Sequence, residues 1–264
     1  MKSTLISLLA VAACVYACFC VYLYLFQRSF IYFPTPATNG TPAEELWLDT
    51  DSGKLRIWRL HADRADAIAY FGGNAEDVAL NIPEFARYFP EHAVYLVNYR
   101  GYGGSTGTPT EGGLYNDANA VFDLIQAGHR NVSLIGRSLG AAVALHLATA
   151  RSADKLVLIT PFDSLSRLAR EFYPIFPTSL LLKDKYDSLG RASRINVPVL
   201  MLVAEYDEIV PGDSYERLSA AINPDLVTVM VIDGASHNSI EMSPQYRRAL
   251  QAFMMPEPVS ADRP

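Results

Sequence analysis

A serine, an aspartate and a histidine in this chain have the residue types and the order needed for nucleophilic catalysis. Ser138 lies in Gly136-Arg137-Ser138-Leu139-Gly140, between an apolar run at 132–135 and an alanine-rich run. A Gly-x-Ser-x-Gly turn between a strand and a helix exposes the serine hydroxyl at the tip of the turn. Asp207 and His237 follow in the order Ser…Asp…His. We therefore predict a catalytic triad of Ser138, Asp207 and His237.

The three residue types are chemically interdependent. A serine hydroxyl is a poor nucleophile until a neutral imidazole accepts its proton, and a carboxylate holds that imidazole in the required tautomer. His237 is the predicted base and Asp207 the predicted acid. Asp163 also follows a predicted strand, and it stays open as the rival acid.

Two backbone N–H groups are candidates for stabilising negative charge on a reacting oxygen. Gly72-Gly73-Asn74 follows the apolar run 67–71, and a glycine pair lets the backbone bend towards a site. The predicted helix after Ser138 offers unpaired N–H groups and the positive end of its dipole. We predict an oxyanion hole made by the N–H groups of Asn74 and Leu139. An ordinary Gly-Gly turn is the alternative at 72–73.

The elements that must position these residues alternate between strand and helix. The predicted strands are 45–48, 54–60, 67–71, 93–97, 132–135, 155–159, 198–203 and 226–232, and the predicted helices are 82–89, 115–126, the run after Ser138, 215–221 and 244–253. The first two strands read as an antiparallel hairpin around Asp51-Ser52-Gly53. The later alternation predicts a mostly parallel sheet with helices on both faces. Ligands bind such sheets at the carboxyl ends of the strands, where all the candidate residues stand.

Composition narrows the class of protein. The chain has 264 residues, 50% of them hydrophobic, and a net charge of −6. This charge gives no basic stripe for nucleic acid. The three cysteines, at positions 14, 18 and 20, all lie in the first twenty residues. The globular part therefore has no disulfide and no thiolate metal site, and we expect neither a metal nor a cofactor.

The N-terminal region is apolar enough to cross a membrane. The stretch 5–26 is nearly unbroken apolar sequence, about 33 Å long as a helix against a hydrocarbon core of roughly 30 Å. An uncleaved anchor is the prediction, and a cleaved signal peptide or a lipoprotein-type signal ending at Cys14 are the alternatives. Lys2 on one side and Arg28 on the other give only a small charge bias. It leans towards a cytoplasmic N-terminus with the domain on the non-cytoplasmic side.

The chain divides into four expected parts. They are a membrane anchor at 1–27, a linker at 28–44, a domain at 45–255 and a flexible tail at 256–264. Within the domain, about 163–197 is expected to form a small lid between two strand ends. The apolar lid stretches 172–177 and 180–182 predict an acyl-binding wall or a patch on the membrane. Plain packing of a long connection is the alternative.

Five spaced motifs together resemble the α/β-hydrolase superfamily. They are Tyr70-Phe71-Gly72-Gly73-Asn74, Asn98-Tyr99-Arg100-Gly101-Tyr102-Gly103, Gly136-Arg137-Ser138-Leu139-Gly140, Asp207 to Pro211, and Gly234-Ala235-Ser236-His237-Asn238. Within the superfamily the chain is similar to the BEM46-like, membrane-anchored serine hydrolases, including its entry sequence at 27–34. The resemblance implies the α/β-hydrolase fold and the same triad positions. The family usually has His-Gly where this chain has Gly72-Gly73.

These observations together predict a membrane-anchored serine hydrolase. It would cleave carboxylic ester or thioester bonds of a small-molecule or lipid substrate through an acyl-enzyme intermediate. A serine peptidase of the same fold is one alternative, because the same triad cleaves amides. A hydrolase-fold binding protein without turnover is the other.

Overall fold

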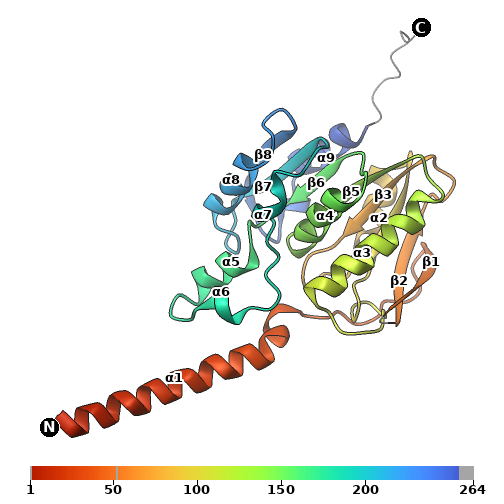
Figure 1. Ribbon diagram of the computed structural model, residues 1–264. Helices are drawn as coiled ribbons and strands as arrows, with labels where there is room; N and C mark the ends of the chain where they lie inside the picture. The colour runs from red at the N-terminus through yellow and green to blue at the C-terminus, as the bar shows by residue number, and fades with distance from the viewer. Residues whose placement is uncertain (1, 52, 256–264) are drawn as a thin grey trace.

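A single eight-stranded sheet forms the centre of the protein in the computed structural model, which describes residues 2–51 and 53–255 (Figure 1). Ser52 of the predicted hairpin turn and the predicted tail 256–264 lie outside the described residues. The strands stand in the order β1-β2-β4-β3-β5-β6-β7-β8. Their bounds are β1 Glu44–Thr50, β2 Gly53–Leu60, β3 Asp66–Phe71, β4 His92–Val97, β5 Asn131–Arg137, β6 Leu156–Ile159, β7 Val199–Tyr206 and β8 Val227–Ser236.

The sheet is parallel from β4 to β8 and antiparallel at the β1–β2 edge. β1 pairs with β2, and β2 with β4, in antiparallel register, whereas the five remaining pairs are parallel. In the parallel part, Phe71 is opposite Gly136 and Ile159 is opposite Arg137. The carboxyl ends of β3, β5 and β6 therefore meet at one edge, so the loops after them lie side by side.

Helices cover both faces of the sheet (Figure 1). On one face pack α3 Glu111–Gln126, α4 Leu139–Ala150 and α8 Gly212–Ala220. On the other face pack α2 Ile82–Tyr88 and α9 Pro244–Met254. Both faces of the central strands are thus covered, which is why these strands are continuous apolar runs in the sequence. The predicted mostly parallel α/β-hydrolase sheet with helices on both faces is confirmed.

Helix α3 and strand β8 are among the elements that extend beyond their predicted ends. Helix α3 begins at Glu111, four residues before the predicted start, because the Thr110 hydroxyl accepts a hydrogen bond from the Gly113 N–H over 2.9 Å and caps the helix. Strand β8 continues to Ser236, which pairs with Tyr206 after an irregularity in the β7–β8 register. The remaining short elements are η1 Val78–Asn81, α7 Leu189–Ala192 and η2 Ile240–Met242.

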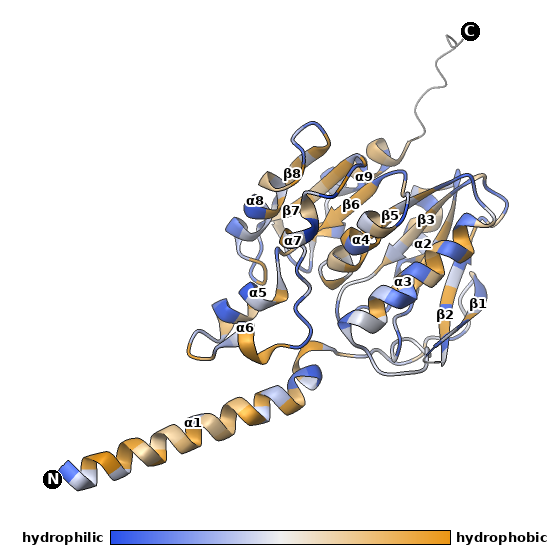
Figure 2. Ribbon diagram, in the orientation of Figure 1, coloured by the Kyte–Doolittle hydropathy of each residue, from blue (hydrophilic) through white to orange (hydrophobic). Residues whose placement is uncertain are grey.

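The N-terminal helix α1 projects away from the sheet. It spans Lys2–Ile31 and is long and apolar enough to cross a membrane. Figure 2 shows hydrophobic residues along most of its length. It continues as helix beyond the predicted anchor boundary at residue 27. Beside its C-terminal half lie the two short helices α5 Leu165–Phe172 and α6 Thr178–Leu181, in the region predicted to form a lid (Figure 1).

Candidate active site

Ser138 occupies a strained turn between β5 and α4. Its backbone has φ 50° and ψ −111°, a conformation that side chains rarely adopt and that costs of order 1–3 kcal/mol. The chain passes so closely here that a Cβ on Gly136 would lie 2.2 Å from the Gly140 carbonyl oxygen, and one on Gly140 would lie 1.9 Å from the Phe71 carbonyl oxygen. Both glycines are therefore required by the close approach of strand and helix.

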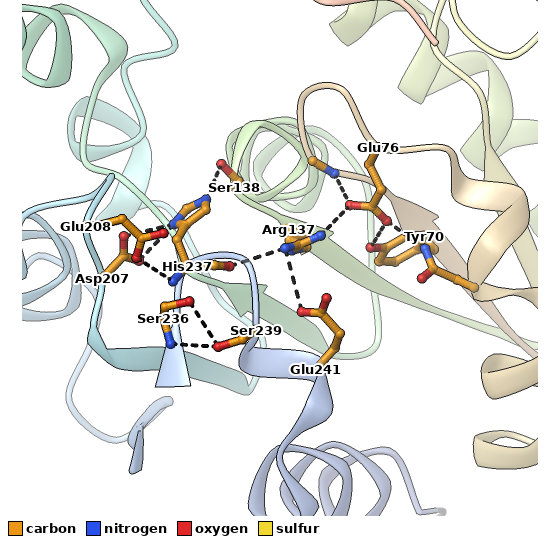
Figure 3. A network of polar contacts seen from close by, with 12 residues as sticks. Tyr70, Glu76, Arg137, Ser138, Asp207, Glu208, Ser236, His237, Ser239 and Glu241 are labelled. Atoms are coloured by element: carbon orange, nitrogen blue, oxygen red, sulfur yellow. Dashed lines mark hydrogen bonds and ion pairs between the residues drawn. The ribbon is translucent and has the colours of Figure 1, made fainter. Parts of the chain in front are cut away.

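The three residues of the predicted triad lie in one hydrogen-bonded chain (Figure 3). The Nε2 atom of His237 is 3.1 Å from the Ser138 hydroxyl oxygen. Its Nδ1 atom is 2.9 Å and 3.0 Å from the two carboxylate oxygens of Asp207. The residues come from different strand ends: Asp207 follows β7, and His237 follows β8. The imidazole thus bridges the hydroxyl and the carboxylate, although the three residues are far apart in the sequence.

The carboxylate of Asp207 is itself held in place. Its Oδ1 atom accepts hydrogen bonds from the N–H groups of Ile209 at 3.0 Å and Val210 at 2.7 Å. The rival acid, Asp163, has a different partner. Its buried carboxylate accepts a hydrogen bond from Arg217 over 2.7 Å. His237 is therefore hydrogen-bonded to Asp207, whereas Asp163 forms an ion pair with Arg217 of α8.

The two predicted oxyanion donors line the same cavity as Ser138. This cavity of about 300 Å³ is bordered by Gly73, Asn74, Leu139 and His237 as well. Within residues 2–51 and 53–255, no hydrogen-bond acceptor is recorded for the N–H of Asn74 or of Leu139, the first residue of α4. Two unpaired donors therefore border the space in front of the Ser138 hydroxyl, as a developing oxyanion requires.

Arg137, the residue before Ser138, joins two loops of the site (Figure 3). Its Nη1 atom is 3.2 Å from the Glu76 carboxylate, which also accepts a hydrogen bond from the Gly73 N–H over 2.6 Å. Its Nη2 atom donates to the main-chain carbonyl oxygen of His237 over 3.2 Å. Arg137 thus connects the glycine loop after β3 with the loop that carries the base. Sequence reasoning missed this role, because the residue type at this position of the motif carries no signal of its own.

Position 72 has little room for a side chain, because Val78 and a polar cluster around Glu76 lie beside it. A Cβ on Gly72 would lie 2.7 Å from the Cγ1 of Val78 and 3.2 Å from the carboxyl carbon of Glu76. The Glu76 carboxylate accepts a hydrogen bond from the Tyr70 hydroxyl over 2.6 Å. Burial lowers the pKa of the Arg137 guanidinium, but the Glu76 carboxylate and other acidic groups raise it more, so its pKa lies above the ordinary value. Val78 and the Glu76 carboxyl group therefore occupy the space beside Gly72, and Arg137 pairs with that carboxylate.

The side chain of Asn74 links the glycine loop to the end of α1. Its Oδ1 atom accepts hydrogen bonds from the Phe33 N–H at 3.1 Å and the Tyr102 hydroxyl at 2.7 Å. Its Nδ2 group donates to the Ile31 carbonyl oxygen over 2.6 Å. Asn74 was predicted only as a backbone donor. The structure adds that its side chain ties the loop of the site to the segment that leaves the N-terminal helix.

Glu208 also contributes to the base loop. It stands beside Asp207 with an exposed side chain, and its carboxylate accepts a hydrogen bond from the His237 N–H over 3.1 Å. As for metals, no group of three or more His, Cys, Asp or Glu side chains in the described ranges is arranged to hold an ion.

Comparisons with known proteins bear on the family and the fold. The sequence model of the alpha/beta hydrolase family matches residues 71–192. The uncharacterized protein Rv2307c of Mycobacterium tuberculosis is 33% identical over 249 residues, covering 88% of each chain. The uncharacterized membrane protein YNL320W of Saccharomyces cerevisiae is 29% identical, over 84% of this chain and 82% of its own.

The fold is also that of a known esterase. The esterase Pf2001 of Pyrococcus furiosus superimposes with a TM-score of 0.69 at 17% identity, over 84% of this chain and 98% of the esterase. An identity this low supports the fold alone. Membership of the family is supported by the sequence matches to the family model and to the relatives. Fold, nucleophile turn and sequence similarity agree, and the chain belongs to the α/β-hydrolase superfamily.

Proposed function

We propose that this protein is a membrane-anchored serine hydrolase that cleaves carboxylic ester or thioester bonds. The observation that carries the proposal is the position of the His237 imidazole, 3.1 Å from the Ser138 hydroxyl and 2.9 Å from the Asp207 carboxylate. Nucleophile, base and acid then stand within hydrogen-bond reach of one another, beside two unpaired backbone donors.

Acylation begins at the Ser138 hydroxyl. Its oxygen attacks the carbonyl carbon of the substrate while Nε2 of His237 accepts the hydroxyl proton. The carbonyl oxygen becomes an oxyanion and receives hydrogen bonds from the N–H groups of Asn74 and Leu139. When the tetrahedral intermediate collapses, the bond to the leaving oxygen or sulfur breaks, and His237 returns the proton to that atom. The alcohol or thiol departs, and the acyl group remains on Ser138.

Deacylation repeats the sequence with water. His237 takes a proton from water, the hydroxide oxygen attacks the acyl carbon, and the second intermediate expels the Ser138 oxygen, which regains its proton from His237. Asp207 stays ionised throughout and stabilises the imidazolium that forms in both steps. Because Ile209 and Val210 hold its carboxylate through their N–H groups, the imidazole keeps one orientation.

The anchor belongs to the same proposal. Helix α1 is 30 residues long and apolar, which supports a single crossing of the bilayer. The end of α1 is joined to the site by the hydrogen bond from the Asn74 amide to the Ile31 carbonyl oxygen. The domain therefore works at the membrane surface.

A fluorophosphonate probe tests the nucleophile in the full-length protein in detergent. We expect the wild type to be labelled and Ser138→Ala to remain unlabelled. Hydrolysis of 4-nitrophenyl butyrate is expected in the wild type and lost in His237→Ala. Ser166→Ala, on the lid helix, is the matched serine control and keeps the label. Equal labelling of the wild type and Ser138→Ala would exclude this nucleophile, and labelling with turnover of peptides alone would make the protein a peptidase.

A further inference from the structure

A second apolar cavity lies between helix α1 and the lid helices α5 and α6. Its volume is about 310 Å³, at the lower end of the roughly 300–1,000 Å³ of small-molecule sites. One wall comes from α1, through Leu23 and Phe30, and the opposite wall comes from the lid, through Leu168, Ala169 and Phe172. The cavity therefore exists only because the membrane helix packs against the lid.

This cavity adjoins the cavity in front of Ser138. Four residues, Ile31, Asn74, Leu165 and Leu168, border both spaces. Ile31 is the last residue of α1, and Asn74 supplies one of the proposed oxyanion donors. The second cavity therefore lies next to the space that contains the hydroxyl of Ser138.

Polar contacts fix α1 against the lid. The buried side chain of Gln27 donates to the Leu181 carbonyl oxygen over 3.0 Å and accepts from the Lys183 N–H over 2.7 Å. Arg28 binds the carboxylate of Asp184 over 3.0 Å. The ammonium of Lys183 also lies 4.1 Å from the centre of the Tyr24 ring, a cation–π contact. Charged and aromatic side chains of this kind mark the membrane–water interface at residues 24–28 of α1.

The tip of the lid lies deeper than that interface. Tyr16 donates a hydrogen bond to the Ile175 carbonyl oxygen over 2.7 Å and stacks on the ring of Phe176. Tyr16 precedes Tyr24 by about 12 Å along the helix, at about 1.5 Å per residue. The loop between α5 and α6 therefore lies alongside the part of α1 that the bilayer surrounds.

The lid also exposes large apolar side chains. Ile175 is 71% exposed, Leu180 is 80% exposed, and Phe172 and Tyr173 are each 55% exposed. In water such a patch costs free energy, whereas in hydrocarbon it does not. Together with the depth of the Tyr16 contacts, this exposure indicates that the lid enters the same bilayer as α1.

We propose that the cavity between α1 and the lid binds the acyl chain of a lipid ester, which enters it laterally from the bilayer. This proposal rests on the proposed function and names the substrate class of that site. The chain passes between α1 and α5, and its carbonyl carbon reaches Ser138 while the polar part of the lipid faces water. The small volume selects one acyl chain, so a second chain stays in the bilayer.

The first experiment asks where the substrate comes from. The full-length protein is placed in phosphatidylcholine vesicles, and dioleoylglycerol is supplied either in the same vesicles or in separate ones. We expect oleate release at least tenfold faster when protein and lipid share one bilayer. Equal rates in the two arrangements would overturn lateral entry, and hydrolysis of an S-acylated peptide without any release of oleate would overturn the lipid assignment.

The second experiment fills the cavity. In Ala169→Trp the indole occupies the space between the lid and α1, and we expect the ratio of kcat/KM for 4-nitrophenyl oleate to that for 4-nitrophenyl butyrate to fall at least tenfold. Ala127→Trp, at an exposed position after α3, is the matched control and keeps the wild-type ratio. An unchanged ratio in Ala169→Trp would overturn the acyl site.

Fluorophosphonate labelling separates this proposal from the one on which it rests. Suppose that the wild type is labelled at Ser138 and hydrolyses the butyrate ester, but that Ala169→Trp has the same oleate-to-butyrate ratio of kcat/KM. The proposed function then stands, and the acyl cavity is overturned. A wild type that is neither labelled nor active contradicts the proposed function itself. Ala169→Leu adds less volume. If the probe does not label Ala169→Trp, the oleate-to-butyrate ratio of kcat/KM in Ala169→Leu tests the acyl cavity instead.

Discussion

Arg137 donates a hydrogen bond to the main-chain carbonyl oxygen of His237 over 3.2 Å. The residue before Ser138 thus holds the loop that carries His237. Its other nitrogen binds Glu76, which in turn accepts a hydrogen bond from the Gly73 N–H. One guanidinium therefore connects the His237 loop with the glycine loop at 72–74. Because rates depend steeply on such distances, this contact gives the first prediction.

Replacing Arg137 by leucine is expected to lower kcat by about 10²-fold with a small change in KM, because a displacement of about 1 Å in the site has an effect of that size. Arg137→Lys keeps the charge and should recover part of kcat. Steady-state kinetics with 4-nitrophenyl butyrate measure both values. Arg151→Leu removes a partly exposed arginine paired with Asp123 and should leave kcat unchanged. A similar loss in Arg151→Leu, or none in Arg137→Leu, would contradict the positioning role.

Gly72→Ala tests the crowding beside the glycine loop. The added Cβ would lie 2.7 Å from Val78 Cγ1, so we expect a loss of about 1–3 kcal/mol in the free energy of unfolding, as for overpacked sites. Gly112→Ala is the matched control, because a Cβ there meets nothing within 4 Å and alanine favours the helix by roughly 0.5–1 kcal/mol. Chemical denaturation of both variants measures the difference. Equal stabilities would mean that Val78 and Glu76 move aside without cost.

Asp207 and Asp163 should separate activity from stability. Asp207→Asn keeps the shape of the side chain but favours the wrong imidazole tautomer, and we expect kcat to fall by about 10⁴-fold. Asp163→Asn leaves Arg217 without its buried partner and should cost about 1–3 kcal/mol of stability with most of kcat retained. Steady-state kinetics and thermal unfolding of the two variants measure the losses of kcat and of stability. A larger loss of kcat in Asp163→Asn would reverse the assignment.

His146 makes stability depend on pH. It stacks on Tyr115 at 3.7 Å between ring centres, and burial, with help from Arg191 and Arg194, lowers its pKa from 6.5 to about 4. Between these two pKa values the unfolded chain binds more protons than the folded chain. The contribution of His146 to the free energy of unfolding is therefore fully present above pH 6.5 and is lost as the pH drops from about 6.5 to about 4. We expect a contribution of roughly 1–2 kcal/mol, reduced by solvent screening at this partly exposed ring.

The measurement compares the wild type with His146→Gln, which carries no titrating group at this position. Chemical denaturation at pH 7 and pH 4.5 should give a smaller drop in the variant than in the wild type. His92, whose pKa burial also lowers, remains in both proteins, so the difference reports His146. Parallel drops in the two proteins would assign the pH dependence to other groups.

The sequence alone determined much of the fold and the members of the candidate site. Periodicity and apolar runs predicted each strand, because a parallel sheet buried on both faces needs continuous apolar sequence. The spacing of glycines around Ser138 predicted a sharp turn, since only residues without a Cβ allow Gly136 and Gly140 to lie against neighbouring backbone. Ser138, Asp207 and His237 could be selected from the sequence because each of them follows a predicted strand. These features depend on local residue patterns and are therefore legible in the sequence.

Other features were decided only by the tertiary structure, because they join residues that no local pattern relates. The choice of Asp207 over Asp163 as the partner of His237 depends on where β7 and β8 end in space. The bridge from Glu76 through Arg137 to His237 joins two loops through the end of β5. The cavity between α1 and the lid arises from packing of segments roughly 150 residues apart in sequence, as in the contact of Gln27 with Leu181. Strands and turns follow from short-range sterics and burial, whereas partners across the sheet are chosen by the packing of the whole chain.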